Sequence, residues 1–337
     1  MEIKISSFLL VLGAGICYSS SAVPARITEK EPEEMNKGNI IRSVCRGCHG
    51  GCGVLVRVEE GRVTEVKGDP QGPINQGRIC IKGKMAPFLA HHPNRLTTPL
   101  RRTTQGWKEI SWDEALGEIS ERFLAIRERW GAEALVLGYG TGRDNEAFIY
   151  RFANLFGTPN VLTAGHMCYG PRIATGIAMC GNLPVVDYRG RPQCVILWGA
   201  NPVVSHPDEY KGFYLVDSIR EGTRLIVVDP RRIPLAERAD IWLPLRPGTD
   251  GALAWGMLSV IIENNWYDEG FVANYIHGWD EFCQRAKEYP LSWAAEVTGL
   301  EPQRIEEVAE LFSHTSPAAI HWGVAIEQGR NLSLIHI

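Results

Sequence analysis

Four cysteines in the first quarter of the chain have the type and spacing of metal ligands. Two residues separate Cys45 from Cys48, three separate Cys48 from Cys52, and 27 separate Cys52 from Cys80. Soft thiolates in this number suit either a tetrahedral zinc ion or a [4Fe–4S] cube. Zinc ribbons use two matched Cys-x₂-Cys pairs, and Cys80 has no such partner, so the spacing favours the cube over zinc and over unligated thiols. Glycines that would let backbone amides approach the sulfides are Gly47, Gly50, Gly51 and Gly53.

The composition favours small-molecule chemistry over nucleic-acid binding. The chain has 337 residues, with 35 Lys and Arg against 39 Asp and Glu, and a formal net charge of −4. Because no basic excess is available to attract a phosphate backbone, we expect no nucleic-acid partner. Nine cysteines are sparse for a disulfide-stapled secreted domain, which supports the thiolate-ligand interpretation. The longest apolar runs, Phe8–Tyr18 and Ala252–Ile262, fall short of the roughly 18 residues of a membrane span.

The elements that must position the cysteines begin with a small, turn-rich β module. Val54–Glu59 and Arg62–Lys67 each alternate apolar and polar residues on either side of Gly61. This pattern predicts a β-hairpin between the third and fourth cysteines. The hairpin would bring Cys80 back toward the other three thiols.

Helices and strands then alternate along the chain. Ser111 precedes an acidic turn and helically spaced apolar residues, which predicts a capped helix over Trp112–Trp130. Further helices are predicted at Asn145–Phe156, Gly251–Glu263 and Gln303–Ser313. Strands are predicted at Ala134–Leu137, Cys194–Trp198, Leu225–Val228 and Ala318–Ile326, with a glycine-rich turn at 138–142. This alternation is typical of a doubly wound parallel sheet, whose ligands bind at the strand ends.

Longer motifs resemble the molybdenum or tungsten oxidoreductases that bind bis(molybdopterin guanine dinucleotide), typified by dimethyl sulfoxide reductase and formate dehydrogenase. The resemblance covers residues 39–329. Its motifs are the cysteine cluster with 77–83, then 93–100, 107–116, 198–207, 228–231 and 246–250. The implied fold class is α/β, with a small β iron–sulfur domain followed by Rossmann-like dinucleotide-binding domains, C-terminally incomplete. The implied parts are a leader or misassigned start (1–39), a 4Fe–4S domain (40–99), a pterin-binding α/β region (100–165), a pterin-dinucleotide domain (166–317) and a truncated returning segment (318–337).

The resemblance also implies cofactors and residue roles. The cofactors would be one [4Fe–4S] cluster on the four cysteines and a Mo- or W-bis(molybdopterin guanine dinucleotide). Lys82, ordinarily a solvated charge, becomes a candidate electron-transfer bridge between cluster and pterin. Cys168 becomes the candidate Mo or W ligand and His166 a candidate catalytic residue, whereas Cys180, Cys194 and Cys283 are expected to be small buried hydrophobes. The candidate pterin contacts are Lys82, Gly199, Asn201, Ser205, His206, Asp229, Arg231, Gly248 and Asp250.

Glycine-rich strand ends can expose amides to a pyrophosphate, and Asp229 and Asp250 can accept hydrogen bonds from a ribose or a guanine edge. Either acid taken alone would more often be a turn or helix-cap residue.

These roles predict a catalytic-subunit portion that performs two-electron redox chemistry on a small molecule in anaerobic respiration, with a separate iron–sulfur subunit as electron partner. Formate dehydrogenases carry a histidine where this chain has Tyr169, and the non-redox acetylene hydratase carries an aspartate where it has His49, so both of those activities are disfavoured. An NAD-dependent dehydrogenase is disfavoured because no Gly-x-Gly-x-x-Gly follows Cys194–Trp198. The alternatives are a hydratase-like enzyme, a non-catalytic iron–sulfur subunit of a respiratory complex and a zinc-stabilised binding module. Because the family's chains continue well beyond residue 337, we expect this chain alone to lack part of the active site.

The N-terminal segment bears on where the protein resides. Lys4, the apolar Phe8–Tyr18 and the small residues after it resemble a signal peptide, whereas Met35 offers a second start. Folded export of a cofactor-loaded enzyme would need a twin-arginine signal, and no Arg-Arg pair precedes Phe8–Tyr18. We therefore predict a cytoplasmic protein, with export through residues 1–25 as the alternative.

Overall fold

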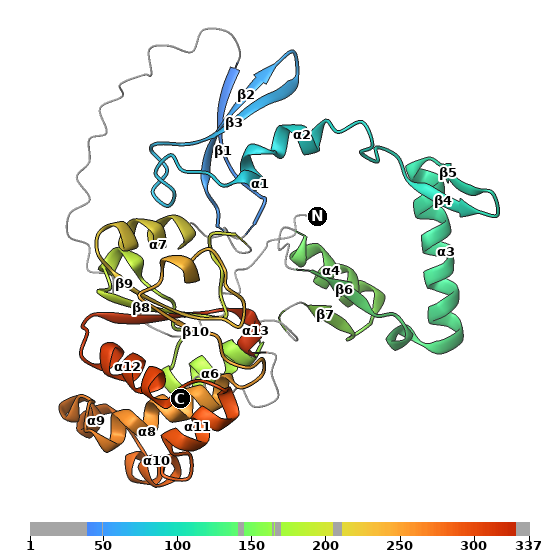
Figure 1. Cartoon of the computed structure of the whole chain (residues 1–337). Coiled ribbons are helices and arrows are strands. Elements are labelled where there is room, and N and C mark those ends of the chain that lie inside the picture. Colours follow the sequence, from blue (N-terminus) through green and yellow to red (C-terminus); the bar gives the residue numbers. More distant parts are fainter. Residues whose placement is uncertain are drawn as a thin grey trace, which may run out of the picture. The chain divides into compact units, whose positions relative to one another are not determined.

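The cysteine-bearing segment folds around a three-stranded antiparallel sheet of order β1-β2-β3 (Figure 1). The strands of this computed structural model are β1 (Asn39–Val44), β2 (Gly53–Glu59) and β3 (Arg62–Gly68). Cys45 directly follows β1 and Cys52 directly precedes β2, so one strand connection carries three of the four cysteines. The predicted hairpin β2-β3 is confirmed, and β1 is an addition to it. The described residues are 39–48, 50–140, 145–163, 165, 170–204 and 211–327.

Two short helices follow the fourth cysteine. The helix α1 (Ile81–Lys84) begins directly after Cys80, which is its N-cap residue, and α2 (Ala86–Ala90) begins after Met85. The N-terminal end of α1 is therefore fixed to a cysteine that is predicted to bind the cluster.

The next segment contains the long helix that the sequence predicts. A hairpin of β4 (Leu100–Thr103) and β5 (Gly106–Glu109) leads into α3 (Trp112–Trp130). The Ser111 Oγ accepts a hydrogen bond of 3.1 Å from the Glu114 backbone N–H, which confirms the predicted cap.

The strand predicted at Ala134–Leu137 is wrong in position. Residues Ala132–Ala134 form a 3₁₀ turn, and β6 begins only at Leu137 and ends at Tyr139. An apolar run of this length has no period that fixes its boundaries. Here the turn and a hydrogen bond of 2.6 Å from the Thr158 Oγ1 to the Leu135 carbonyl take up the first part of the run. The strand β6 pairs in parallel with β7 (Val161–Thr163) across α4 (Glu146–Phe156), the latter close to its predicted bounds.

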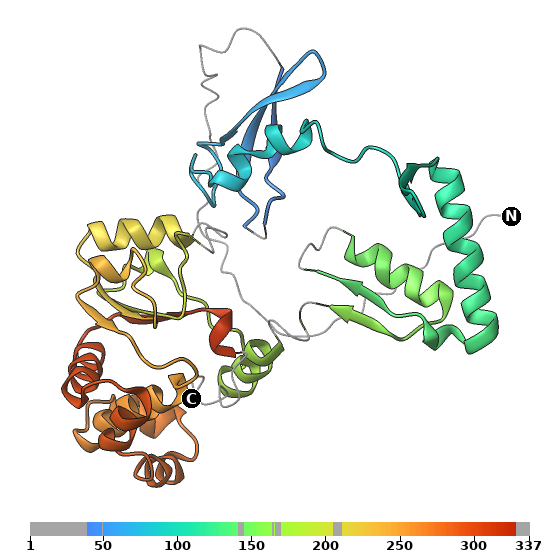
Figure 2. The same cartoon turned by 45° about the vertical axis from the view of Figure 1, so that its right-hand side comes forward.

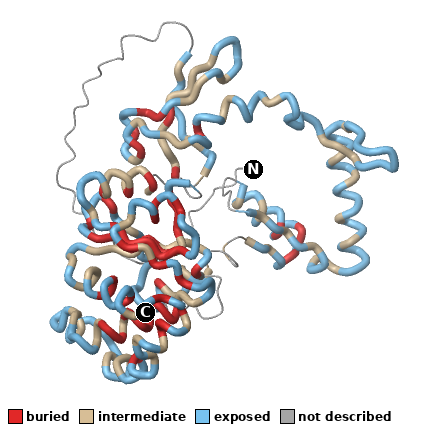
Figure 3. The backbone as a smooth tube through the Cα atoms, viewed as in Figure 1, coloured by how far each residue is buried: buried red, intermediate tan, exposed pale blue. Residues whose placement is uncertain are grey.

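The largest sheet is parallel and has the strand order β10-β9-β8-β11. Its strands are β8 (Cys194–Trp198), β9 (Arg224–Val228), β10 (Ile241–Leu243) and β11 (Ala318–Trp322). All five residues of β8 are buried, as expected for the centre of a sheet covered on both faces. Figure 3 shows the buried residues gathered in this sheet and in the helices against it.

Successive residues of β8 pack into two separate cores. Cys194, Ile196 and Trp198 face one core with α8 (Asp250–Glu263), α11 (Leu291–Thr298) and α12 (Pro302–Ser313), whereas Val195 and Leu197 face the other with α7 (Lys211–Arg220). The two views in Figures 1 and 2 show these helices on opposite faces of the sheet. The remaining elements are α6 (Gly170–Cys180), η2 (Tyr188–Gly190), η4 (Ala236–Arg238), α9 (Glu269–Tyr275), α10 (Trp279–Ala286) and α13 (Val324–Glu327).

The last strand ends earlier than predicted. The sequence suggests a strand through Ile326, but β11 ends at Trp322 and α13 begins at Val324. Gly323 lies against the end of β8, where its backbone N–H donates a hydrogen bond of 2.9 Å to the Trp198 carbonyl. Within the described ranges, no helix is long and apolar enough to cross a membrane.

Candidate functional site

The four predicted cluster ligands lie close together. Burial raises the pKa of the Cys52 thiol, and the neighbouring Cys48, Cys45 and Cys80 raise it further because thiolates repel one another. The four donors are all soft thiols, and in a [4Fe–4S] cube each thiolate binds a different iron. The chemistry of this donor set fits a cube.

Backbone groups support the thiols. The Gly50 N–H donates a hydrogen bond of 3.3 Å to the Cys48 Sγ, and the Cys45 N–H donates one of 2.8 Å to the Cys52 carbonyl. Amide donors directed at cysteine sulfur stabilise the charge of a metal-bound thiolate. The loop is thus arranged for anionic sulfur.

Lys82 lies beside the cysteines, in α1. A Cβ added to Gly47 would lie 3.5 Å from the Lys82 Cβ and 3.6 Å from the Cys45 Sγ. A Cβ added to Gly83 would lie 3.3 Å from the same sulfur. The two glycines therefore leave room around Cys45, and the base of the Lys82 side chain stands next to this space.

A second candidate region lies at the carboxyl ends of β8 and β11, where the strand order of the large sheet reverses. Ligands of open parallel sheets bind at such points. Gly199, directly after β8, has a positive φ of 55°. A Cβ added to Gly323, directly after β11, would lie only 2.0 Å from the Gly199 carbonyl oxygen. Only glycine at position 323 allows the two strand ends to approach in this way.

Asp229 follows the neighbouring strand β9 and is buried. Its Oδ1 accepts a hydrogen bond of 2.8 Å from the Arg231 backbone N–H and lies 3.7 Å from the Arg231 Nε. The Trp242 Nε1 donates a hydrogen bond of 2.9 Å to the Asp229 carbonyl. The Asp229 Oδ1 therefore stabilises the turn after β9 and forms an ion pair with the exposed Arg231 guanidinium.

Asp250 is tied to the end of β8. The Trp198 Nε1 donates a hydrogen bond of 2.9 Å to the Asp250 Oδ1, across 52 positions of sequence. Gly248 has a positive φ of 81° and open space where a Cβ would stand, and Asn201 is buried after β8. Trp198 was not among the predicted site residues, because nothing in a sequence shows which carboxylate a strand-end indole reaches.

Several predicted residues lie outside the described residues: His49, His166, Cys168, Tyr169, Ser205 and His206. Those that the structure describes form two groups, the four cysteines with Lys82 and the strand-end group of Gly199, Asn201, Asp229, Arg231, Gly248 and Asp250. Of the three other cysteines that the structure describes, Cys194 is buried as predicted, whereas Cys180 at the end of α6 is exposed and Cys283 is half-buried.

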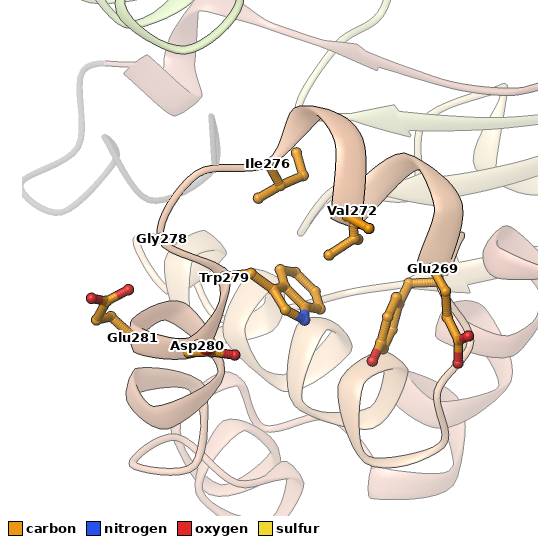
Figure 4. A pocket seen from close by; sticks show the side chains of 9 residues that line it. Glu269, Val272, Ile276, Gly278, Trp279, Asp280 and Glu281 are labelled. Carbon is orange, nitrogen blue, oxygen red and sulfur yellow. The ribbon is translucent and has the colours of Figure 1, made fainter.

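A cavity of about 430 Å³ lies elsewhere, between α9 and α10. Figure 4 shows the Trp279 indole among the side chains that line it. It is lined by Tyr267, Glu269, Val272, Ala273, Ile276 and residues 278–281. None of the predicted site residues contributes to it.

Comparison with known proteins identifies two family profiles that match consecutive parts of the chain. The profile of the molybdopterin oxidoreductase Fe4S4 domain matches residues 39–92, and that of molybdopterin oxidoreductase matches residues 95–336. Acetylene hydratase of Syntrophotalea acetylenica is 36% identical over 300 residues, which are 86% of this chain and 40% of that protein. Formate dehydrogenase H of Escherichia coli K12 is 32% identical over 299 residues, 85% of this chain and 41% of that protein.

The fold is likewise shared with a solved structure. Acetylene hydratase from Pelobacter acetylenicus superposes with a TM-score of 0.76 at 34% identity, over 88% of this chain and 42% of that one. The chain thus spans about two fifths of the length of these relatives.

Proposed function

Because the chain belongs to the molybdopterin oxidoreductase family and has its Fe4S4 domain, we propose that it is the N-terminal part of a catalytic subunit for two-electron redox chemistry. The observation that supports this most strongly is the grouping of four thiols within the Fe4S4 domain. We assign the cluster to residues 40–99 and the pterin to 100–165 and to a Rossmann-like 166–317, with 1–39 as a leader or misassigned start and 318–337 as the start of a returning segment. The bound Mo or W pterin would supply the redox chemistry, and the protein would supply ligands, orientation and electrostatics.

Each cysteine of the cluster would bind one iron: Cys45, Cys48, Cys52 and Cys80. The positively charged Lys82, two residues after Cys80, would stabilise added electrons on the anionic cluster by electrostatic attraction. Cys168 would supply a thiolate to Mo or W, and His166 would lie near the substrate.

The strand-end group suits a dinucleotide. The dinucleotide would lie at the carboxyl ends of β8 and β9, where the exposed Arg231 would pair with a phosphate oxygen. Asp250, already held by Trp198, has a second carboxylate oxygen that can accept from a guanine edge. We assign the dinucleotide to Gly199, Asn201, Ser205, His206, Asp229, Arg231, Gly248 and Asp250, with Lys82 at its pterin end.

The reaction would use a small-molecule substrate and exchange electrons with a separate iron–sulfur subunit, in the cytoplasm. The similarity to acetylene hydratase supports a second candidate, hydration of a triple bond, which would proceed with no net electron transfer. The redox candidate is preferred because His49 follows the second cluster cysteine, a position at which the family resemblance implies an aspartate in the hydratase.

The experiment uses a chain extended to the length of its relatives. We expect it to contain Mo or W and molybdopterin, and to oxidise a reduced viologen when offered S-oxides, N-oxides, nitrate or arsenate. The Cys168→Ala variant should lose turnover and change the metal's spectrum while keeping its iron, whereas Cys180→Ala should behave as the parent. Conversion of acetylene without any viologen turnover would replace redox catalysis by the hydratase candidate, and full activity in Cys168→Ala would refute the ligand assignment.

A further inference from the structure

The segment between β3 and Cys80 is held from within by one buried amide. Asn75 is only 2% exposed. Its Oδ1 accepts a hydrogen bond of 2.9 Å from the Gly53 N–H, and its Nδ2 donates to the Gly53 carbonyl at 3.0 Å and to the Arg78 carbonyl at 2.7 Å. Gly53 adjoins Cys52, and Arg78 stands two residues before Cys80. A single side chain therefore connects the backbone beside the third cysteine to the backbone beside the fourth.

The residues just before Asn75 are held from outside. The Ile74 carbonyl accepts hydrogen bonds from the Tyr214 hydroxyl at 2.8 Å and from the Arg189 Nη2 at 3.3 Å, and the Pro73 carbonyl accepts from the same Nη2 at 3.0 Å. Arg189 also donates to the Tyr214 hydroxyl at 2.8 Å. These contacts join the turn at residues 73–75 to η2 and α7.

The element η2 is itself anchored to the large sheet, and α7 makes a further contact with the segment before Cys80. Next to Arg189, the buried Tyr188 hydroxyl forms a hydrogen bond of 2.5 Å with the His321 Nδ1 of β11. Asp217 of α7 forms an ion pair with Arg78. The turn is thus connected through η2 to the sheet strand that ends at Gly323.

We propose that Asn75 and Arg189 are positioning residues for the [4Fe–4S] cluster: Asn75 sets the separation of its third and fourth ligands, and Arg189 holds the same turn from outside. This rests on the proposed function. Cys80 is the ligand most distant in sequence, so its arrival at the cluster depends on how well this turn is ordered. With the turn held, Cys80 stays bound and the cluster is slow to lose iron.

The substitution Asn75→Asp tests the amide with little change of shape. It replaces two N–H donors by a carboxylate oxygen that faces the carbonyls of Gly53 and Arg78. The Arg78 carbonyl loses this donor, whereas the Gly53 carbonyl keeps its hydrogen bond of 2.9 Å from the Asp69 N–H. Asn75→Ala removes the connection without adding charge. Arg189→Met removes the guanidinium contacts to the Pro73 and Ile74 carbonyls at an exposed position, while the Tyr214 hydrogen bond to Ile74 stays.

The experiment uses the 337-residue chain with its cluster reconstituted without oxygen. The rate of iron release to an excess of ferrozine is measured at constant temperature, together with the EPR spectrum of the reduced cluster and the midpoint of thermal unfolding. Asn264→Ala and Arg304→Met are matched controls, because they remove an amide hydrogen bond to Val260 and an exposed ion pair with Glu307, both far along the chain from the cysteines.

We expect iron release about tenfold faster in Asn75→Asp and Asn75→Ala and a few-fold faster in Arg189→Met, with an altered EPR spectrum. The controls should keep the parent's rate and spectrum, and Arg189→Met should keep its unfolding midpoint. Release and spectra in all three variants equal to the controls would overturn the proposal. A parent chain that binds zinc and no iron would instead defeat the proposed function, so the two failures are distinguishable.

Discussion

At the scale of single residues, charge next to the cysteines sets how easily the cluster accepts an electron. The Cβ of the solvent-exposed Lys82 lies close to Gly47, and the Cys45 Sγ borders the same space. A positive side chain near an anionic redox centre favours the state with the added electron, and water screens part of this effect at an exposed position. We therefore expect Lys82 to favour the reduced cluster.

Replacing Lys82 by Met should lower the cluster's midpoint potential while leaving its iron bound. In the extended enzyme the same change should slow turnover with a viologen about tenfold or more. Potentiometric titration followed by EPR measures the shift. Lys84→Met is the matched control on the same helix, and an equal potential in the two variants would contradict the role given to Lys82.

Cys194 gives a pH dependence of stability. Burial raises the pKa of its thiol from the ordinary 9.0 to about 11. Between these values the unfolded chain has lost the proton and the folded chain keeps it, so the free energy of unfolding falls as pH rises. The contribution reaches about 2–3 kcal/mol at pH 11.

Urea unfolding at pH 8 and at pH 9–11 checks this prediction. The stability difference between parent and Cys194→Ala should change in favour of the variant across pH 9–11. Cys180→Ala, which alters an exposed thiol, should show a constant difference from the parent. A constant difference for Cys194→Ala as well would show that its thiol titrates equally in both states.

At the scale of elements, the sequence predicts best where local chemistry determines the boundary. Ser111 and its acidic turn define the start of α3, and an uninterrupted apolar run defines β8. The strand near Leu137 is misplaced because an apolar run of uniform character can shift along its own length. The end of β11 depends on Gly323 meeting the Gly199 carbonyl, a contact between segments far apart in the chain.

The site residues that could be predicted belong to a local motif, whereas those that could not be predicted are defined by contacts between distant segments. The cysteines and Lys82 are visible as a short motif, and the structure brings them together. Asn75, Arg189 and Trp198 each have a partner far away in sequence, at 22, 116 and 52 positions respectively, so no local pattern shows what they contact.

The contact between the ends of β8 and β11 should be intolerant of any side chain. Gly323→Ala would place a Cβ 2.0 Å from a backbone oxygen, so we expect the variant to lower the thermal unfolding midpoint by several degrees or more. Gly117→Ala, in α3 with nothing near the new Cβ, should leave it unchanged or raise it. An unfolding midpoint for Gly323→Ala equal to that of Gly117→Ala would mean that the strand ends do not meet as described.

At the scale of the whole molecule, the chain exposes much apolar surface. Large side chains on α3 and α4 stand in solvent, among them Trp112 at 64%, Phe148 at 72% and Leu155 at 73% exposure. Exposed apolar surface of this extent is typical of a region that other protein surface covers.

We expect the 337-residue chain to bind the dye ANS strongly and to self-associate as its concentration rises. The double variant Phe148→Glu, Leu155→Lys should reduce dye fluorescence and light scattering. Unchanged dye binding would show that the dye binds apolar surface outside α4.

We assign a [4Fe–4S] cluster to the four cysteines of this molybdopterin oxidoreductase chain. The most direct measurement is metal and sulfide analysis of the 337-residue chain after anaerobic reconstitution with iron and sulfide in the presence of equimolar zinc. We expect about four irons and four acid-labile sulfides per chain. Cys48→Ser should lose most of the iron and Cys180→Ser should keep it. Stoichiometric zinc without labile sulfide would contradict the account.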